Sequence, residues 1–95
     1  SPSRPLAAFA GRYHHKGYGD LFVEVGANGL RAAYNAMPMA LAHWHYDVFN
    51  AVPDRGEDSD LRDIKFVFQA NADGQISSFS AKLDDGVPPI VFDRM

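Results

Sequence analysis

The feature that most constrains this chain is a series of short apolar segments, separated by turn signals about every 8–12 residues. Residues 21–25 and 64–68 both place apolar side chains at alternate positions, the period of a half-buried strand. Residues 26–29 (Gly-Ala-Asn-Gly) and 71–74 (Asn-Ala-Asp-Gly) have the composition of tight hairpin turns. No segment combines helical period with the length of a long helix. The pattern therefore predicts an all-β chain.

We expect about eight short strands after one helical turn at residues 6–10. The expected strands cover residues 12–15, 21–25, 30–34, 39–45, 48–52, 64–70, 75–83 and 90–94. Pro38 should interrupt the connection before the fourth strand, and a shift in the apolar face predicts a bulge near residues 77–78. Consecutive hairpins favour an up-and-down antiparallel meander, which closes to hide its edges. A small antiparallel β-barrel is the predicted fold, with a sandwich as the alternative.

Composition limits the domain organisation and the class of partner. Ninety-five residues make one small domain, and we expect residues 1–5 to be a linker or cloning remnant and residues 6–95 a single β-barrel. A net charge of −3 without a basic cluster disfavours nucleic-acid binding. The absence of cysteine excludes disulfides, zinc ribbons and thiol catalysis. No apolar run approaches the roughly 18 residues of a membrane-spanning helix.

The candidate binding or interdomain site is the run His43, Trp44, His45, Tyr46 and Asp47. It lies at the junction of two expected strands, where a turn should place its aromatic and ionisable groups at one end of the barrel. On a regular strand the two histidines would share one face, and the tryptophan would take the other.

A metal site at this run would need a third ligand. His43 and His45 have a spacing at which two imidazoles can bind one zinc ion, and Asp47, His14 or His15 could complete the set. Nothing in the sequence places any of those three nearby. The alternative is that one histidine is an internal hydrogen-bonded residue and the other lies at the barrel rim. We assign no metal and no cofactor.

Other motifs point away from catalysis within this chain. Ser77, Ser78 or Ser80 could be imagined with His43 and Asp47 as a hydrolase triad, but no Gly-x-Ser-x-Gly or Ser-x-x-Lys motif surrounds them. We assign no catalytic residue.

Two loops resemble ligand-binding motifs but are better interpreted as ordinary connections. The acidic residues of segment 53–63 lack the spacing of a calcium-binding EF-hand loop, so we expect a solvated loop. The glycine-rich segment 17–20 precedes no helix and is expected to be a turn rather than a phosphate-binding loop.

The entry to the first strand is similar to that of lipocalin-like barrels. These begin with a short helix that covers the barrel bottom, followed by Gly-x-aromatic, here Gly11-Arg12-Tyr13. In that family an arginine from the last strand packs over the aromatic ring, and Arg94 is the candidate here.

Several segments together resemble one family. They are LAAFAGRY at residues 6–13, YGDL at 18–21, LAHWHYDVF at 41–49, FVF at 66–68 and GQI at 74–76. The chain is similar over nearly its whole length to the uncharacterised domain found C-terminal to serine β-lactamase-like, penicillin-binding-protein-like hydrolases. Phe9 stands where that family usually has tyrosine.

The resemblance implies a non-catalytic accessory barrel whose partner is the N-terminal β-lactamase-like catalytic domain of the same chain. In such proteins the Ser-x-x-Lys motif belongs to the preceding domain, so no catalytic residue is carried over here. It also implies a periplasmic or secreted bacterial protein, and leaves the oligomeric state open. Two other hypotheses are kept: a barrel that binds a small molecule in an internal cavity of about 300 Å³ or more, and a histidine-based metal site.

Overall fold

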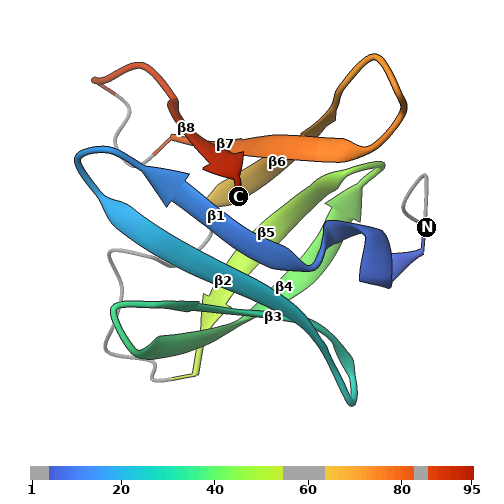
Figure 1. The fold of residues 1–95 in the computed structure, drawn as a ribbon. Coiled ribbons are helices and arrows are strands. Elements are labelled where there is room, and N and C mark those ends of the chain that lie inside the picture. The colour runs from blue at the N-terminus through green and yellow to red at the C-terminus, as the bar shows by residue number, and fades with distance from the viewer. Residues whose placement is uncertain (1–4, 55–63, 83–85) are drawn as a thin grey trace.

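The described residues form a closed antiparallel β-barrel with strands in sequence order (Figure 1). The computed structural model describes residues 5–54, 64–82 and 86–95. Each strand pairs with the next, and the eighth pairs with the first to close the ring. This arrangement confirms the predicted barrel and not the sandwich. No helix in the described part of the chain is long and apolar enough to cross a membrane.

One 3-10 turn precedes eight strands in the described residues. The elements are η1 (Leu6–Phe9), β1 (Gly11–His15), β2 (Gly19–Gly26), β3 (Gly29–Tyr34), β4 (Met37–His45), β5 (Val48–Pro53), β6 (Lys65–Ala70), β7 (Ile76–Ala81) and β8 (Ile90–Arg94). Strand alternation places one face of each strand inside the barrel, where its apolar side chains exclude water. Of the predicted loop at residues 53–63, residues 55–63 lie outside the described residues.

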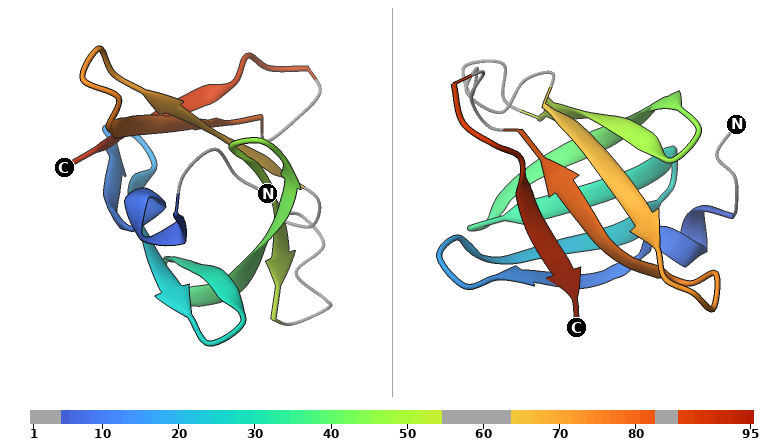
Figure 2. Two further views of the ribbon diagram at one scale, coloured as in Figure 1. Left: turned by 90° about the vertical axis from the view of Figure 1, so that its right-hand side faces the viewer. Right: turned by 90° about the horizontal axis from the view of Figure 1, so that it is seen from above.

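The two ends of the barrel differ, and we name them by what covers them. At the closed end, η1 lies beside the β2–β3, β4–β5 and β6–β7 turns, which gather on the right of Figure 1. The left view of Figure 2 faces this end and shows η1 within the outline of the ring. At the open end lie the β1–β2 and β3–β4 turns and the beginnings of β6 and β8. No helix covers that end in the described part of the chain.

Phe9 plugs the closed end. Its side chain is fully buried, and its ring meets those of Phe49 and Phe68 edge to face, with centroids 5.3 and 5.1 Å apart. The hydroxyl of buried Tyr13 donates to the Phe9 carbonyl at 2.7 Å, which ties η1 to β1. Burial raises the pKa of Tyr13 to about 12, partly offset by the charge of Arg94. The plug is therefore held by ring packing and by one buried hydrogen bond.

Arg94 fastens η1 to the end of the barrel, but not in the predicted way. Its guanidinium donates to the carbonyls of Ala8 (3.2 Å), Ala10 (2.6 Å) and Ile76 (3.1 Å). The predicted cation–π contact with Tyr13 is absent within the described residues, where these three carbonyls orient the guanidinium. Within the described residues, a cation–π contact joins Lys65 and Trp44 instead.

Two local predictions had different outcomes. The bulge near residues 77–78 is confirmed, because the pairing shifts from Gln69–Ser78 to Ala70–Ile76 and leaves Ser77 as the extra residue. The prediction that Pro38 interrupts the chain is wrong. Pro38 lies second in β4 and pairs with Ala33, a position near a strand start where a missing N–H is tolerated.

Candidate functional site

A β-bulge shapes the run that the sequence singled out. His43 pairs with Phe49 and His45 pairs with Val48, so Trp44 is the extra residue of β4. Cross-strand partners share a face, and consecutive residues of β5 face opposite sides. The two histidines therefore lie on opposite faces, and the prediction that they share one is wrong. His43 faces the buried side, where its ring lies 5.4 Å from that of Phe49.

Local hydrogen bonds and ring contacts fix the turn that follows. His43 Nε2 lies 2.7 Å from the Tyr46 carbonyl oxygen, to which it donates, because a carbonyl can only accept. Tyr46 has a positive φ of 50°, and its ring lies 4.2 Å from that of His45. The Asp47 carbonyl accepts from the backbone N–H of Phe68 at 3.0 Å. The turn is thus anchored to β6 and within itself.

The bulge and turn leave two large aromatic side chains in solvent. Trp44 is 61% exposed and Tyr46 is 67% exposed. The ammonium nitrogen of Lys65, on the outer face of β6, lies 4.7 Å from the centroid of the Trp44 ring. We call His43, Trp44, His45, Tyr46 and Asp47 the aromatic hairpin. It is a polar and aromatic surface, and exposed aromatic side chains of this kind are enriched in interface cores.

A surface groove of about 390 Å³ adjoins the aromatic hairpin at the closed end. It is lined by residues of η1, the β2–β3 turn and strands β3–β5, namely Leu6, Asn28, Gly29, Leu30, Leu41, Ala42, His43 and Phe49. His43 belongs to both the groove and the hairpin. The closed end therefore presents protruding rings beside a largely apolar depression.

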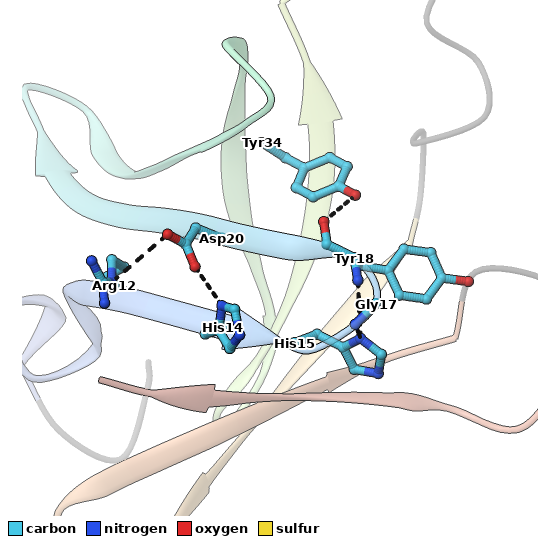
Figure 3. A network of polar contacts seen from close by, with 7 residues as sticks. All are labelled: Arg12, His14, His15, Gly17, Tyr18, Asp20 and Tyr34. Atoms are coloured by element: carbon cyan, nitrogen blue, oxygen red, sulfur yellow. Dashed lines mark hydrogen bonds and ion pairs between the residues drawn. The ribbon is translucent and has the colours of Figure 1, made fainter.

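The candidate metal site is not assembled among the described residues. No group of three or more His, Cys, Asp or Glu side chains that could hold a metal occurs in the described ranges. His14 and His15 are on β1 toward the open end, whereas His43 is at the closed end. As predicted, the two adjacent histidines face opposite sides, and His14 Nδ1 lies 2.6 Å from an Asp20 carboxylate oxygen on the outer surface. That carboxylate also lies 3.9 Å from Arg12 (Figure 3).

The imagined serine triad is not assembled either. Ser77, Ser78 and Ser80 lie on β7, which is separated from β5 by β6. The Ser77 hydroxyl lies 3.5 Å from the Gln69 carbonyl oxygen, and His43 donates to a carbonyl of its own turn. Among the described residues, the His43 imidazole and the Ser77 hydroxyl therefore have separate partners.

A second site, at the open end, was not recognised in the sequence. His15 Nδ1 accepts from the backbone N–H groups of Gly17 (2.9 Å) and Tyr18 (3.1 Å), which places the proton of the neutral ring on Nε2 (Figure 3). The Tyr34 hydroxyl donates to the Tyr18 carbonyl at 2.7 Å and links the β1–β2 turn to β3. We call His15, Tyr18 and Tyr34 the tyrosine rim. The available signal was an aromatic residue between two glycines, Gly17 and Gly19, where a turn usually carries small polar residues.

Below the tyrosine rim lies an apolar pocket of about 120 Å³. Its lining comes from the β1–β2 turn, from strands β2–β8 and from the residue before β6, and consists of Tyr18, Leu21, Tyr34, Met39, Ala51, Ile64, Phe66, Phe79, Ala81 and Phe92. The sequence could not reveal it, because its residues are scattered along the chain and meet only when the barrel closes.

The comparisons with known proteins gave one match. A family model described as "Domain of unknown function (DUF3471)" matches residues 1–93. The search of curated proteins and the search of solved structures found no match.

Proposed function

Because the chain belongs to the DUF3471 family of uncharacterised domains, we propose that it is a non-catalytic accessory domain of a serine β-lactamase-like hydrolase. The proposed partner is the catalytic domain that precedes it in the same polypeptide, in a periplasmic or secreted bacterial protein. The accessory domain packs beside the substrate cleft and modulates it. The link to the hydrolase rests on the sequence resemblance, most specifically on the segments at residues 6–13 and 41–49.

The observation that carries the proposal is the exposure of Trp44 and Tyr46 on an anchored hairpin. Solvent-exposed aromatic rings with restricted motion lose little conformational entropy on docking, so they suit the centre of an interface. The adjoining groove, which includes Leu6 and Leu41, offers an apolar surface for a side chain of the partner. Exposed apolar surface of this kind marks interaction sites.

The path of the chain also supports docking at the closed end of the barrel. η1 leads into β1 at the closed end, beside the aromatic hairpin (Figure 2). A domain joined ahead of η1 by a short linker would therefore meet the closed end before any other surface.

The test begins with the reading frame upstream of Ser1, which should encode a domain with a Ser-x-x-Lys motif. That catalytic domain is then titrated into this chain, and binding is followed through Trp44, the single tryptophan, whose emission should shift to the blue on burial. In calorimetric titrations Trp44→Ala should weaken binding about tenfold or more. The matched control is Phe22→Ala, which removes a 52% exposed ring from the outer face of β2 and should leave binding unchanged. An upstream frame without such a domain, or equal binding by both variants, contradicts the proposal.

Two other hypotheses, an internal cavity for a drug-sized molecule and a histidine-based metal site, have less support. The pocket inside the barrel, about 120 Å³, is smaller than the 300 Å³ or more that a drug-sized molecule needs. His43 and His45 lie on opposite faces of β4, which separates the two candidate zinc ligands.

A further inference from the structure

The pocket at the open end has one aromatic wall, made by the edges of three stacked rings whose faces cover one another. Phe66, Phe79 and Phe92, on the adjacent strands β6, β7 and β8, stack with ring planes 6° and 8° apart and centroids 4.7 and 4.9 Å apart. Strand pairing holds the stack in place, since Phe79 and Phe92 are directly opposite each other. Each of these three residues is buried, with an exposed fraction of 4% or less. The wall is therefore preformed rather than assembled on binding.

The empty volume exists because two lining positions carry small side chains. Ala51 on β5 and Ala81 on β7 are both buried and line the pocket, where larger residues would fill it. At the closed end the comparable space is occupied by the ring of Phe9. The open end thus lacks about one aromatic ring of packing.

Water is a poor occupant of this space. The exposed lining of the pocket is contributed entirely by apolar atoms, so a water molecule there would give up hydrogen bonds without replacing them. An apolar cavity of about 150 Å³ in another protein stays dry and binds benzene or xenon. A pocket of similar size and chemistry has a favourable occupant only among small apolar groups.

The tyrosine rim gives the pocket an entrance. Tyr18 and Tyr34 belong both to the rim and to the lining, and the Tyr34–Tyr18 hydrogen bond holds the β1–β2 turn at the pocket edge. Tyr18 is 42% exposed, so its ring separates the pocket from solvent without being packed into the core. Displacement of this ring would open the pocket on the side of the β1–β2 turn.

From the aromatic wall, the two alanines and the apolar lining, we propose that the open end is a binding site for a small uncharged molecule that carries a single aromatic ring. The ring packs against the edges of Phe66, Phe79 and Phe92 and fills the space beside Ala51 and Ala81. This site is at the opposite end of the barrel from the aromatic hairpin and does not depend on the proposed hydrolase partner.

The experiment is a calorimetric titration of this chain with benzene, repeated with naphthalene. Benzene should bind with a Kd of about 1 mM or tighter and raise the Tm through linkage, whereas naphthalene should bind at least about tenfold more weakly. Ala51→Val and Ala81→Val each place extra methyl groups in the pocket and should weaken benzene binding about tenfold or more. Ala33→Val is the matched control, because Ala33 lies on the outer face of β3, opposite the exposed Phe22, and lines neither the pocket nor the groove.

Circular dichroism establishes that each variant is folded before its titration is interpreted, and the two pocket alanines provide independent variants if one does not fold. The proposal is overturned if folded wild-type protein shows neither binding heat nor a Tm increase with benzene. It is also overturned if both pocket variants bind benzene as well as Ala33→Val does, or if naphthalene binds as tightly as benzene. Docking through Trp44 should be the same in all three alanine variants, so failure of this site leaves the proposed function untouched.

Discussion

The two ends of this barrel are made by the same eight strands, yet they differ in how side chains fill the interior. At the closed end the ring of Phe9 fills the interior, and the rings of Trp44 and Tyr46 project into solvent. At the open end Ala51 and Ala81 leave space inside. The closed end thus exposes aromatic side chains, and the open end encloses an apolar space.

The difference shows that a small barrel can carry two kinds of surface without a change of topology. Interior volume at each end is set by a few inward positions, since strand alternation fixes which residues point inside. The closed end uses a turn of 3-10 helix in place of longer strands to cover its opening. We expect the two ends to differ most in what a lost side chain costs.

The largest difference should come from removing one ring at each end. Phe9→Ala leaves a cavity among Phe49, Phe68 and Tyr13 and should cost about 3–5 kcal/mol of unfolding free energy. Tyr18→Ala at the open end removes a partly exposed ring and should cost less than about 1.5 kcal/mol. Chemical denaturation of both variants measures the contrast. Equal losses would show that the open end is packed as tightly as the closed one.

A tyrosine hydroxyl donates to a backbone carbonyl at each end, and alkaline pH should distinguish the two. The pKa of Tyr13 is raised from 10.0 to about 12, so the unfolded chain loses this proton first as pH rises. Stability from this group is therefore complete below pH 10 and declines between pH 10 and 12, by up to about 1.4 kcal/mol per pH unit.

Tyr13→Phe should remove that part of the alkaline decline, at a cost of about 1 kcal/mol at neutral pH for the lost hydrogen bond. Tyr34→Phe deletes the corresponding bond at the open end but retains Tyr13, and should retain the decline. Urea denaturation from pH 8 to 12 follows both variants. A decline as steep in Tyr13→Phe as in the wild type would contradict the assignment.

The fold was predictable because it is encoded locally, in alternating segments such as residues 64–68 and in turn residues at 71–74. The faces of His43 and His45 were not predictable. The bulge at Trp44 lies in a run without alternating apolar residues, so no change in the phase of such an alternation could reveal it. The bulge at Ser77 was predictable for the opposite reason, since the apolar residues on either side of it visibly change phase.

Contacts between distant segments were the least predictable. Arg94 was expected over a ring, but its donors bind the carbonyls of Ala8, Ala10 and Ile76, and the convergence of these carbonyls depends on how η1 crosses the barrel end. The pocket depends on two alanines, Ala51 and Ala81, which are unremarkable in the sequence and acquire meaning only when β5 and β7 enclose one space.

The hydrogen bonds of Arg94 should contribute to the stability of the closed end. Arg94→Met keeps the apolar stem but removes the donors to Ala8, Ala10 and Ile76, and should cost about 1–2 kcal/mol because the freed carbonyls regain only water. Arg12→Met is the matched control, since Arg12 is an exposed arginine at 3.9 Å from Asp20 and should matter by less than about 0.5 kcal/mol. Thermal and urea denaturation compare the two. Equal effects would mean that the three hydrogen bonds of Arg94 contribute little.

The smallest expected effect lies in the β3–β4 turn at the open end. Asn35 and Ala36 have positive φ angles of 50° and 64°, a conformation that glycine adopts without strain and alanine does not. Ala36→Gly should therefore stabilise the barrel by about 0.5 kcal/mol, as the relief of strain exceeds the added entropy of the unfolded chain. Ala33→Gly, three residues earlier in β3, should instead destabilise the barrel by about 0.5–1 kcal/mol. The backbone of a strand is already unstrained with alanine, so glycine adds only entropy to the unfolded chain. Urea denaturation of both variants gives the sign directly, and a loss of stability in Ala36→Gly would show that this turn is relaxed as alanine.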